Sequence, residues 1–173
     1  MSSRRKNDII QKNVALWGYS SGAHLALLYA FSRHGRSPID IAFCAGMAPP
    51  SYFPDPDWIA EMPIAVPVFA LLLKAPVTAK NIFTTYADIA ADASPYAHLD
   101  RDCPPVIVCF GKLDDKVLYS NALLMQEKLA RLGAQGYEYE YLLFENSGHN
   151  LDNDPKTSAR FSAVFDEFME KYM

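Results

Sequence analysis

Three short segments that lie far apart in the sequence carry the side chains needed for nucleophilic catalysis. Residues 18–22 read Gly-Tyr-Ser-Ser-Gly and match the pattern G-x-S-x-G around Ser20, while Asp114 and His149 follow later in the chain. A serine hydroxyl is a weak nucleophile until a histidine accepts its proton, and a carboxylate can hold that imidazole in the required tautomer. Asp115 is the competing acid, and its alternative role is that of a solvated turn residue. The order serine, acid, histidine predicts acyl transfer through a Ser-His-Asp triad.

Each of these residues directly follows a segment that reads as a buried β-strand. Residues 13–17 precede the serine motif, residues 105–110 precede the acid, and residues 137–144 precede His149; residues 39–45 are a further strand candidate. Residues 105–110 are nearly all apolar, as expected of a strand that is covered on both faces. Because working residues in open parallel sheets lie beyond the carboxyl ends of the strands, we expect the three side chains to meet there.

Helical segments alternate with these strands. Residues 20–35 predict a helix that Gly35 closes, and residues 119–132 and 155–172 place apolar side chains at helical spacing. Asp154 is the predicted N-cap of the last helix. The alternation predicts an α/β fold, with a parallel sheet and helices on both of its faces.

Residues 49–95 interrupt this alternation and are rich in proline. An interruption of this length is expected to be functional or to form a small subdomain. We expect short helices and loops, which would form a lid-like insertion in a single domain spanning residues 1–173. Trp58 and Phe69 are candidate pocket residues, although a plain core role fits them equally well. Tyr19, beside the nucleophile, is a third candidate.

The chain resembles the α/β-hydrolase superfamily, in its esterase/lipase (carboxylesterase) branch. The resemblance rests on GYSSGAHLALL, on SPYAH at residues 94–98, on PPVIVCFGKLDD and on NSGHN. It implies that Ser20 is the nucleophile, His149 the general base and Asp114 the orienting acid. It also implies that the backbone N–H of Ser21 donates to the oxyanion.

Relative to that superfamily, the chain begins late. Twelve residues precede the first predicted strand, so the first strands of the usual fold and a loop with further oxyanion donors are expected to be missing. The sequence thus predicts a partial α/β-hydrolase fold. The first strand would expose one edge, which predicts a homo-oligomer through that edge. We expect the isolated chain to be weak or inactive as a hydrolase unless the edge is covered.

The function expected from these motifs is hydrolysis of carboxylic esters with short acyl or sugar-linked groups, so the partner is a small-molecule ester. An arylformamidase, which uses the same triad on an N-formyl amide, is the nearest alternative. An oligopeptidase-type peptidase ranks lower, because that branch has a second glycine where Ala23 follows Gly22. A truncated, non-catalytic remnant of the fold that binds a partner is the alternative from another class.

Composition excludes several other classes. Sixteen Lys+Arg against twenty Asp+Glu give a net charge of −4, and the one basic cluster is residues 4–6, so no nucleic-acid partner is expected. The apolar runs are too short to cross a bilayer, and the N-terminal residues lack the apolar core of a signal peptide. We therefore expect no membrane partner and a cytoplasmic location.

No cofactor and no metal are predicted. The sequence has no glycine-rich dinucleotide motif, and its cysteines lack the spacing of metal ligands, with Cys44 and Cys109 inside apolar runs. The remaining histidines are expected to have structural roles. His24 and His98 would be packed or hydrogen-bonded, and His34 would lie near a helix end, where a cation is favoured.

Overall fold

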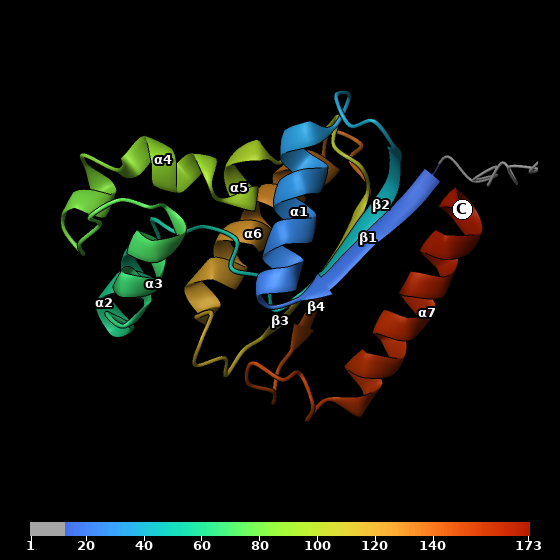
Figure 1. Ribbon diagram of the computed structural model, residues 1–173. Coiled ribbons are helices and arrows are strands. Elements are labelled where there is room, and N and C mark those ends of the chain that lie inside the picture. Colours follow the sequence, from blue (N-terminus) through green and yellow to red (C-terminus); the bar gives the residue numbers. More distant parts are fainter. Residues whose placement is uncertain (1–12) are drawn as a thin grey trace, which may run out of the picture.

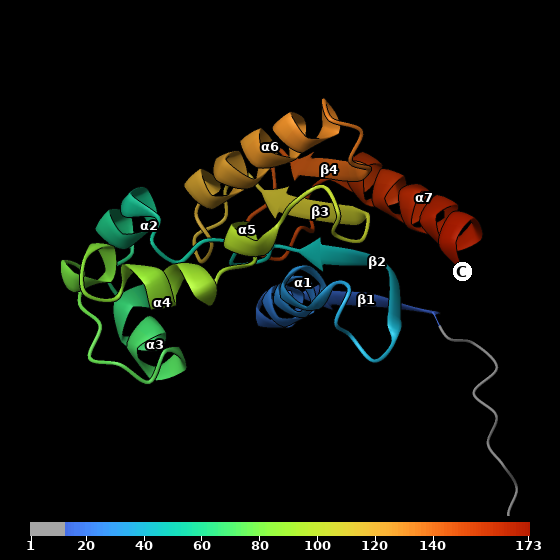
Figure 2. The same ribbon diagram turned by 90° about the horizontal axis from the view of Figure 1, so that it is seen from above.

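The computed structural model describes residues 13–173 of the chain, so the basic residues 4–6 and the segment tested for a signal peptide lie outside the described residues. Four parallel strands form one sheet in the spatial order β1-β2-β3-β4 (Figure 2). The strands are β1 (Asn13–Tyr19), β2 (Asp40–Met47), β3 (Val106–Gly111) and β4 (Tyr139–Phe144). All of them were predicted, with bounds that shift by at most a few residues.

Helices cover both faces of the sheet, with α1 and α6 on one side and α7 on the other (Figure 1). This arrangement confirms the predicted fold class. The helices are α1 (Ser21–Arg33), α2 (Pro56–Glu61), α3 (Ala65–Leu72), α4 (Ala87–Asp92), α5 (Pro95–His98), α6 (Tyr119–Gly133) and α7 (Pro155–Tyr172), and η1 (Asn81–Phe83) is a 3₁₀ turn. None of the described helices is long and apolar enough to cross a membrane.

The alternation of side chains along β3 explains why one strand joins two apolar layers. Every residue of β3 is buried. Val106, Val108 and Phe110 pack in the layer of α1 and α6, whereas Ile107 and Cys109 pack in the layer of α7. Successive side chains of a strand point to opposite faces, so a strand with helices on both sides must be apolar at every position.

Residues 49–95 form short helices that extend beyond the carboxyl ends of the strands (Figure 2). This segment has an apolar cluster of its own, which includes Phe53, Trp58 and Phe69. Val117, from the connection between β3 and α6, belongs to the same cluster. The segment is therefore packed directly against one of the loops that carry the candidate catalytic residues.

Candidate active site

Ser20 lies in a tight turn between β1 and α1 and has an unusual backbone conformation. Its φ is 54° and its ψ is −121°, which costs a residue with a side chain about 1–3 kcal/mol. The turn is held by a hydrogen bond of 2.8 Å from Ser20 N to Met47 O on the neighbouring strand. A Cβ atom on Gly18 would lie 2.4 Å from the carbonyl carbon of Gly22, so the close approach of strand and helix requires glycine there.

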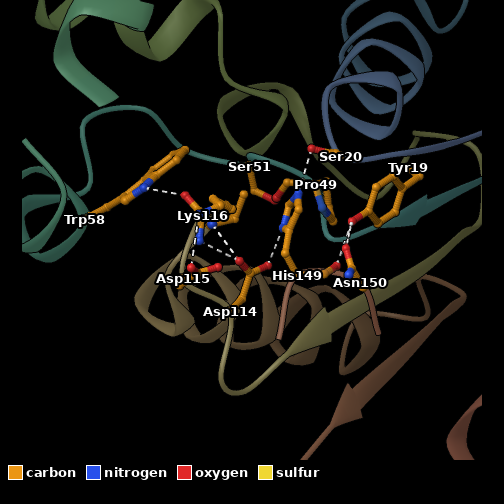
Figure 3. Close-up of polar contacts among 11 residues, drawn as sticks. Tyr19, Ser20, Pro49, Ser51, Trp58, Asp114, Asp115, Lys116, His149 and Asn150 are labelled. Atoms are coloured by element: carbon orange, nitrogen blue, oxygen red, sulfur yellow. Dashed lines mark hydrogen bonds and ion pairs between the residues drawn. The ribbon is translucent and has the colours of Figure 1, made fainter. Parts of the chain in front are cut away.

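The three side chains singled out from the sequence lie together beyond the ends of β1, β3 and β4 (Figure 3). His149 Nε2 lies 2.8 Å from Ser20 Oγ, and His149 Nδ1 lies 2.7 Å from Asp114 Oδ2. The Asp114 side chain is only 1% exposed. Its other oxygen accepts hydrogen bonds from the backbone N–H groups of Lys116 and Val117, so this carboxylate is compensated by fixed donors.

Asp115, the competing acid, has a different environment. Its side chain is exposed and forms a 3.0 Å ion pair with Lys116 Nζ. The hydrogen bond from Lys116 lowers the pKa of the Asp115 carboxyl. Asp114 is therefore the carboxylate that contacts His149.

A glycine lets the acid loop and the histidine loop approach each other. A Cβ atom on Gly111 would lie 2.3 Å from Gly148 O and 2.7 Å from Ser147 O. The two loops are also joined by a 3.0 Å hydrogen bond from Leu113 N to Ser147 O. Any side chain at position 111 would push the loops apart and separate the carboxylate from the imidazole.

Asp154 organises the histidine loop from the side remote from Ser20. It accepts hydrogen bonds from Ser147 Oγ at 2.6 Å and from the backbone and side-chain nitrogens of Asn146 at 3.0 and 2.8 Å. These bonds, that of Ser147 above all, lower the pKa of the Asp154 carboxyl. Asp154 is the N-cap residue of α7, as predicted, but its side chain makes no capping hydrogen bond because the loop donors occupy the carboxylate. Only its carbonyl oxygen serves the helix, by accepting from Ser158 N.

Tyr19 lies beside the histidine loop and is not among the residues that line the cavity next to Ser20. Its hydroxyl donates to His149 O at 3.0 Å and lies 3.3 Å from Asn150 Oδ1 (Figure 3). Its ring centroid lies 5.3 Å from that of His149. As the last residue of β1, Tyr19 is placed beside the histidine loop and supports its backbone.

An apolar cavity of about 560 Å³ opens beside Ser20 and His149. Trp58 and Phe69 line it, as α2 and α3 bring them to the edge of the site. Further apolar lining comes from α1, from α3 with its flanking residues, and from the connections between β2 and α2 and between β3 and α6. These residues include Leu25, Leu28, Pro50, Phe53, Met62, Ile64, Val68, Leu72, Leu73 and Val117.

His24 also lines this cavity, which the sequence analysis did not predict. Its Nδ1 lies 2.8 Å from Pro50 O, and its ring stacks on Phe53 with centroids 5.0 Å apart. Burial lowers the pKa of His24, so the ring is neutral at neutral pH. The expectation that His24 is hydrogen-bonded is confirmed. The first helix does not point away from the site as expected, because the first turn of α1 borders the cavity.

The first turn of α1 supplies the electrostatic setting for a negative charge. Ser21 is the first residue of this helix and lines the cavity next to Ser20. Backbone N–H groups in the first turn of a helix have no acceptor within the helix, and the helix dipole favours negative charge there. The Ser21 N–H is thus suited to donate to an oxyanion that forms on a carbonyl attacked by Ser20.

Comparison with solved structures identifies the fold as that of the α/β-hydrolases. An esterase from Thermogutta terrifontis with bound propionate superposes with a TM-score of 0.61 at 18% identity, over 91% of this chain and 55% of that chain. An acylaminoacyl peptidase from Pyrococcus horikoshii gives 0.67 at 16% identity, over 93% and 24%. A truncated carbohydrate esterase from gut microbiota gives 0.60 at 16% identity, over 90% and 58%.

The sequence itself matches the prolyl oligopeptidase family over residues 76–173, more than half of the chain. The chain therefore belongs to the prolyl oligopeptidase family. No curated protein matched it in a search of full sequences. Together, the family and the neighbouring structures support a serine hydrolase. The chain spans about half of the length of the esterases and about a quarter of the peptidases.

The family match corrects the low rank that the sequence analysis gave to the oligopeptidase branch. That rank rested on Ala23, which lies outside the matched residues 76–173. The matched half contains Asp114 and His149 but not the serine turn. The departure at Ala23 therefore lies outside the residues on which the family match rests.

Proposed function

We propose that this chain carries the active site of a serine hydrolase that cleaves carboxylic esters with an apolar acyl group. The observation that carries this proposal is the continuous hydrogen-bonded path from Ser20 to His149 to Asp114 at the border of an apolar cavity. The sequence left short-acyl and sugar-linked esters open. The lining has few polar side chains to bind sugar hydroxyls, which favours an acyl chain in the cavity.

The geometry supports a two-step mechanism. Ser20 Oγ attacks the ester carbonyl carbon while His149 Nε2 takes the hydroxyl proton, and the Ser21 N–H donates to the resulting oxyanion. The carbon–oxygen bond to the alcohol then breaks, and His149 returns the proton to the departing alkoxide. Water, deprotonated by His149, hydrolyses the acyl-enzyme and releases the acid. Asp114 stays ionised, holds the imidazole tautomer and stabilises its charged form.

Cleavage of an acylated amide or peptide is a second candidate. It is favoured by the match to the prolyl oligopeptidase family and by the similarity to acylaminoacyl peptidases. An arylformamidase belongs to the same amide-cleaving alternative. The leaving group is an amine in these reactions, so His149 would have to protonate a nitrogen rather than an oxygen.

Parallel kinetics on matched substrates test the proposal. We expect p-nitrophenyl butyrate and octanoate to be hydrolysed with a higher kcat/KM than acetyl-alanine p-nitroanilide. Ser20→Ala should abolish the activity, whereas Asp115→Asn should retain it. A higher kcat/KM for the anilide would establish the second candidate instead. Ester turnover that survives in a folded Ser20→Ala variant would overturn both.

We also propose that the chain forms a homo-oligomer through the edge of the sheet at β1. Among the described residues, β1 pairs with β2 alone, so its other side presents backbone donors and acceptors. Trp17, on this strand, is 61% exposed. Sedimentation analysis that finds a stable folded monomer at micromolar concentration would contradict the proposal. A dimer that Trp17→Lys dissociates would support it.

A further inference from the structure

A second cluster of chemically capable side chains lies away from the candidate active site. His34 directly follows α1, and Asp100 and Cys103 lie in the connection between α5 and β3. One ligand atom from each of these residues lies within 4.8 Å of the other two. α1 starts directly after Ser20 and runs away from the carboxyl ends of the strands, so the cluster lies at its opposite end (Figure 1).

The separations within the cluster are close to those of a metal coordination shell. Cys103 Sγ lies 3.4 Å from Asp100 Oδ1 and 3.5 Å from His34 Nδ1, and His34 Nε2 lies 3.9 Å from Asp100 Oδ2. In a tetrahedral zinc site, metal–ligand bonds of about 2.0–2.3 Å put the ligand atoms roughly 3.3–3.8 Å apart. The 3.5 Å separation is measured to His34 Nδ1, so coordination through Nε2 would require the His34 ring or the Cys103 side chain to rotate.

The His34 ring is oriented as a metal ligand usually is. Its Nδ1 lies 2.6 Å from Phe31 O, where it can only be the donor. The other nitrogen, Nε2, then has a free lone pair on the side of Asp100. Histidines that bind metals commonly donate their second ring N–H to a backbone carbonyl, which fixes the tautomer.

Cys103 has more acceptors around it than its single proton can satisfy. Besides the Asp100 carboxylate at 3.4 Å, the carbonyl oxygens of His98 and Phe31 lie 3.5 and 3.9 Å from Sγ. A bound cation would have to displace the thiol proton, so the sulfur would bind it as the thiolate.

A separate polar cavity of about 410 Å³ gives access to the cluster. His34 and Cys103 line it together with the acidic residues Asp40 and Asp102. The backbone N–H of Asp102 also donates to Asp100 Oδ1 at 2.9 Å, which orients the carboxylate. The cavity thus provides a route for a cation, further negative charge and room for a water to complete the shell.

We propose that His34, Asp100 and Cys103 bind a thiophilic divalent cation of the Zn²⁺ type. Imidazole, carboxylate and thiolate are the ligands that zinc takes in proteins. The ion would join the end of α1 to the connection that leads into β3, and so stabilise the sheet at the end remote from Ser20. The sequence analysis predicted no metal, because the ligands come from segments far apart in the chain.

Titration of the metal-free full chain with Co²⁺ tests this site without depending on catalysis. We expect one equivalent to bind and to produce the near-ultraviolet charge-transfer band of a cobalt–thiolate bond. Cys103→Ser should remove the band, and His34→Asn should weaken binding by about 10-fold or more. Two matched control variants should retain the cobalt–thiolate band. Cys109→Ala removes another buried cysteine, and His98→Asn removes another helix-end histidine beside an aspartate.

A measurement on the unmodified chain keeps the test independent of how the variants fold. X-ray absorption of the Zn²⁺-loaded protein should show one sulfur ligand at about 2.3 Å and otherwise nitrogen or oxygen ligands. A shell without sulfur would overturn the proposal. So would a folded chain that gives no cobalt–thiolate band, or a band that persists in folded Cys103→Ser.

Discussion

Two regions meet at the candidate active site, and different forces hold them. The loops that follow β1, β3 and β4 are short, and backbone hydrogen bonds and close glycine contacts position them. Residues 49–95 are instead held by an apolar cluster of their own, in which Phe53, Trp58 and Phe69 are buried. The first region fixes the positions of reacting atoms, whereas the second shapes the space beside them.

The inner part of the insertion is nevertheless tied to the catalytic loops by polar contacts. Asp55 is 1% exposed and accepts hydrogen bonds from Ser120 Oγ at 2.6 Å and Asn121 Nδ2 at 2.9 Å. Trp58 Nε1 donates to Lys116 O at 2.9 Å (Figure 3). Since the N–H of Lys116 donates to the Asp114 carboxylate, α2 contacts the loop that carries the acid.

The outer part, around α3, has no such polar anchors among those described and leaves apolar side chains in solvent. Ile64 and Leu71 are 75% and 77% exposed, and Val68 and Leu72 are more than half exposed. The opposite face of α3 is buried in the apolar cluster through Val66 and Phe69, so apolar packing rather than polar anchors holds this helix. We therefore keep the lid-like role of residues 49–95 as a proposal, with α3 as its moving part.

The largest predicted effect lies in the catalytic loops. Asp114→Asn should lower kcat by about 10⁴-fold, because the amide favours the wrong imidazole tautomer and does not stabilise the charged form. Ester kinetics on folded protein would measure this change. Asp115→Asn is the neighbouring control, and its kcat should stay within a few-fold of the parent. Equal losses in the two variants would contradict the assignment of the acid.

A change in the insertion should affect binding and stability rather than the reacting groups. Phe69 stacks on Phe53 with ring centroids 4.6 Å apart and meets Trp58 edge-on at 5.1 Å. Phe69→Ala should cost about 3–5 kcal/mol of stability and raise KM for octanoate more than for acetate. Chemical denaturation and acyl-length kinetics would measure both effects. Phe83→Ala, at an exposed position of the same segment, is the control, and similar losses there would refute the pocket role.

A smaller effect is expected at the contact between the two regions. Trp58→Phe keeps an aromatic ring but removes the donor to Lys116 O, which should cost about 1 kcal/mol. If α2 steadies the acid loop, kcat should also fall a few-fold while KM changes little. Denaturation and ester kinetics would measure the two quantities. An unchanged kcat would mean that the contact is structural only.

The smallest predicted effect is on the pH dependence of stability, and it comes from the histidine loop. Hydrogen bonds from Ser147 and Asn146 lower the pKa of Asp154 in the folded protein, so the unfolded chain binds the proton more readily. This stabilisation is present above the unfolded pKa of about 4 and is lost as the pH falls through the lower folded value. Thermal melts from pH 6 to 2.5 should show a shallower acid decline in Asp154→Asn. Asp166→Asn, on the exposed face of α7, is the control, and parallel curves for the parent and Asp154→Asn would contradict the prediction.

The fold could be predicted because its signals are local. A short all-apolar run such as residues 105–110 is typical of a strand between two layers, and the strands other than residues 39–45 are each followed by a segment with helical periodicity. The proximity of Ser20, Asp114 and His149 also followed, because the carboxyl ends of parallel strands share one edge of the sheet.

The roles that could not be predicted depend on contacts between distant segments. Asp154 has the sequence context of a helix cap, and only the folded loop shows that Ser147 and Asn146 occupy its carboxylate. The approach of His34 to Cys103 depends on where two connections cross at the far end of α1. Neither contact corresponds to a residue spacing that would be recognisable in the sequence.

Covalent labelling with a fluorophosphonate tests the central claim most directly, since it reports an activated serine without requiring the right substrate. We expect one label per chain, mapped to Ser20, which is absent in Ser20→Ala and forms much more slowly in His149→Ala. A folded chain that takes no label, or that is labelled at another residue, would contradict the claim that His149 and Asp114 activate Ser20.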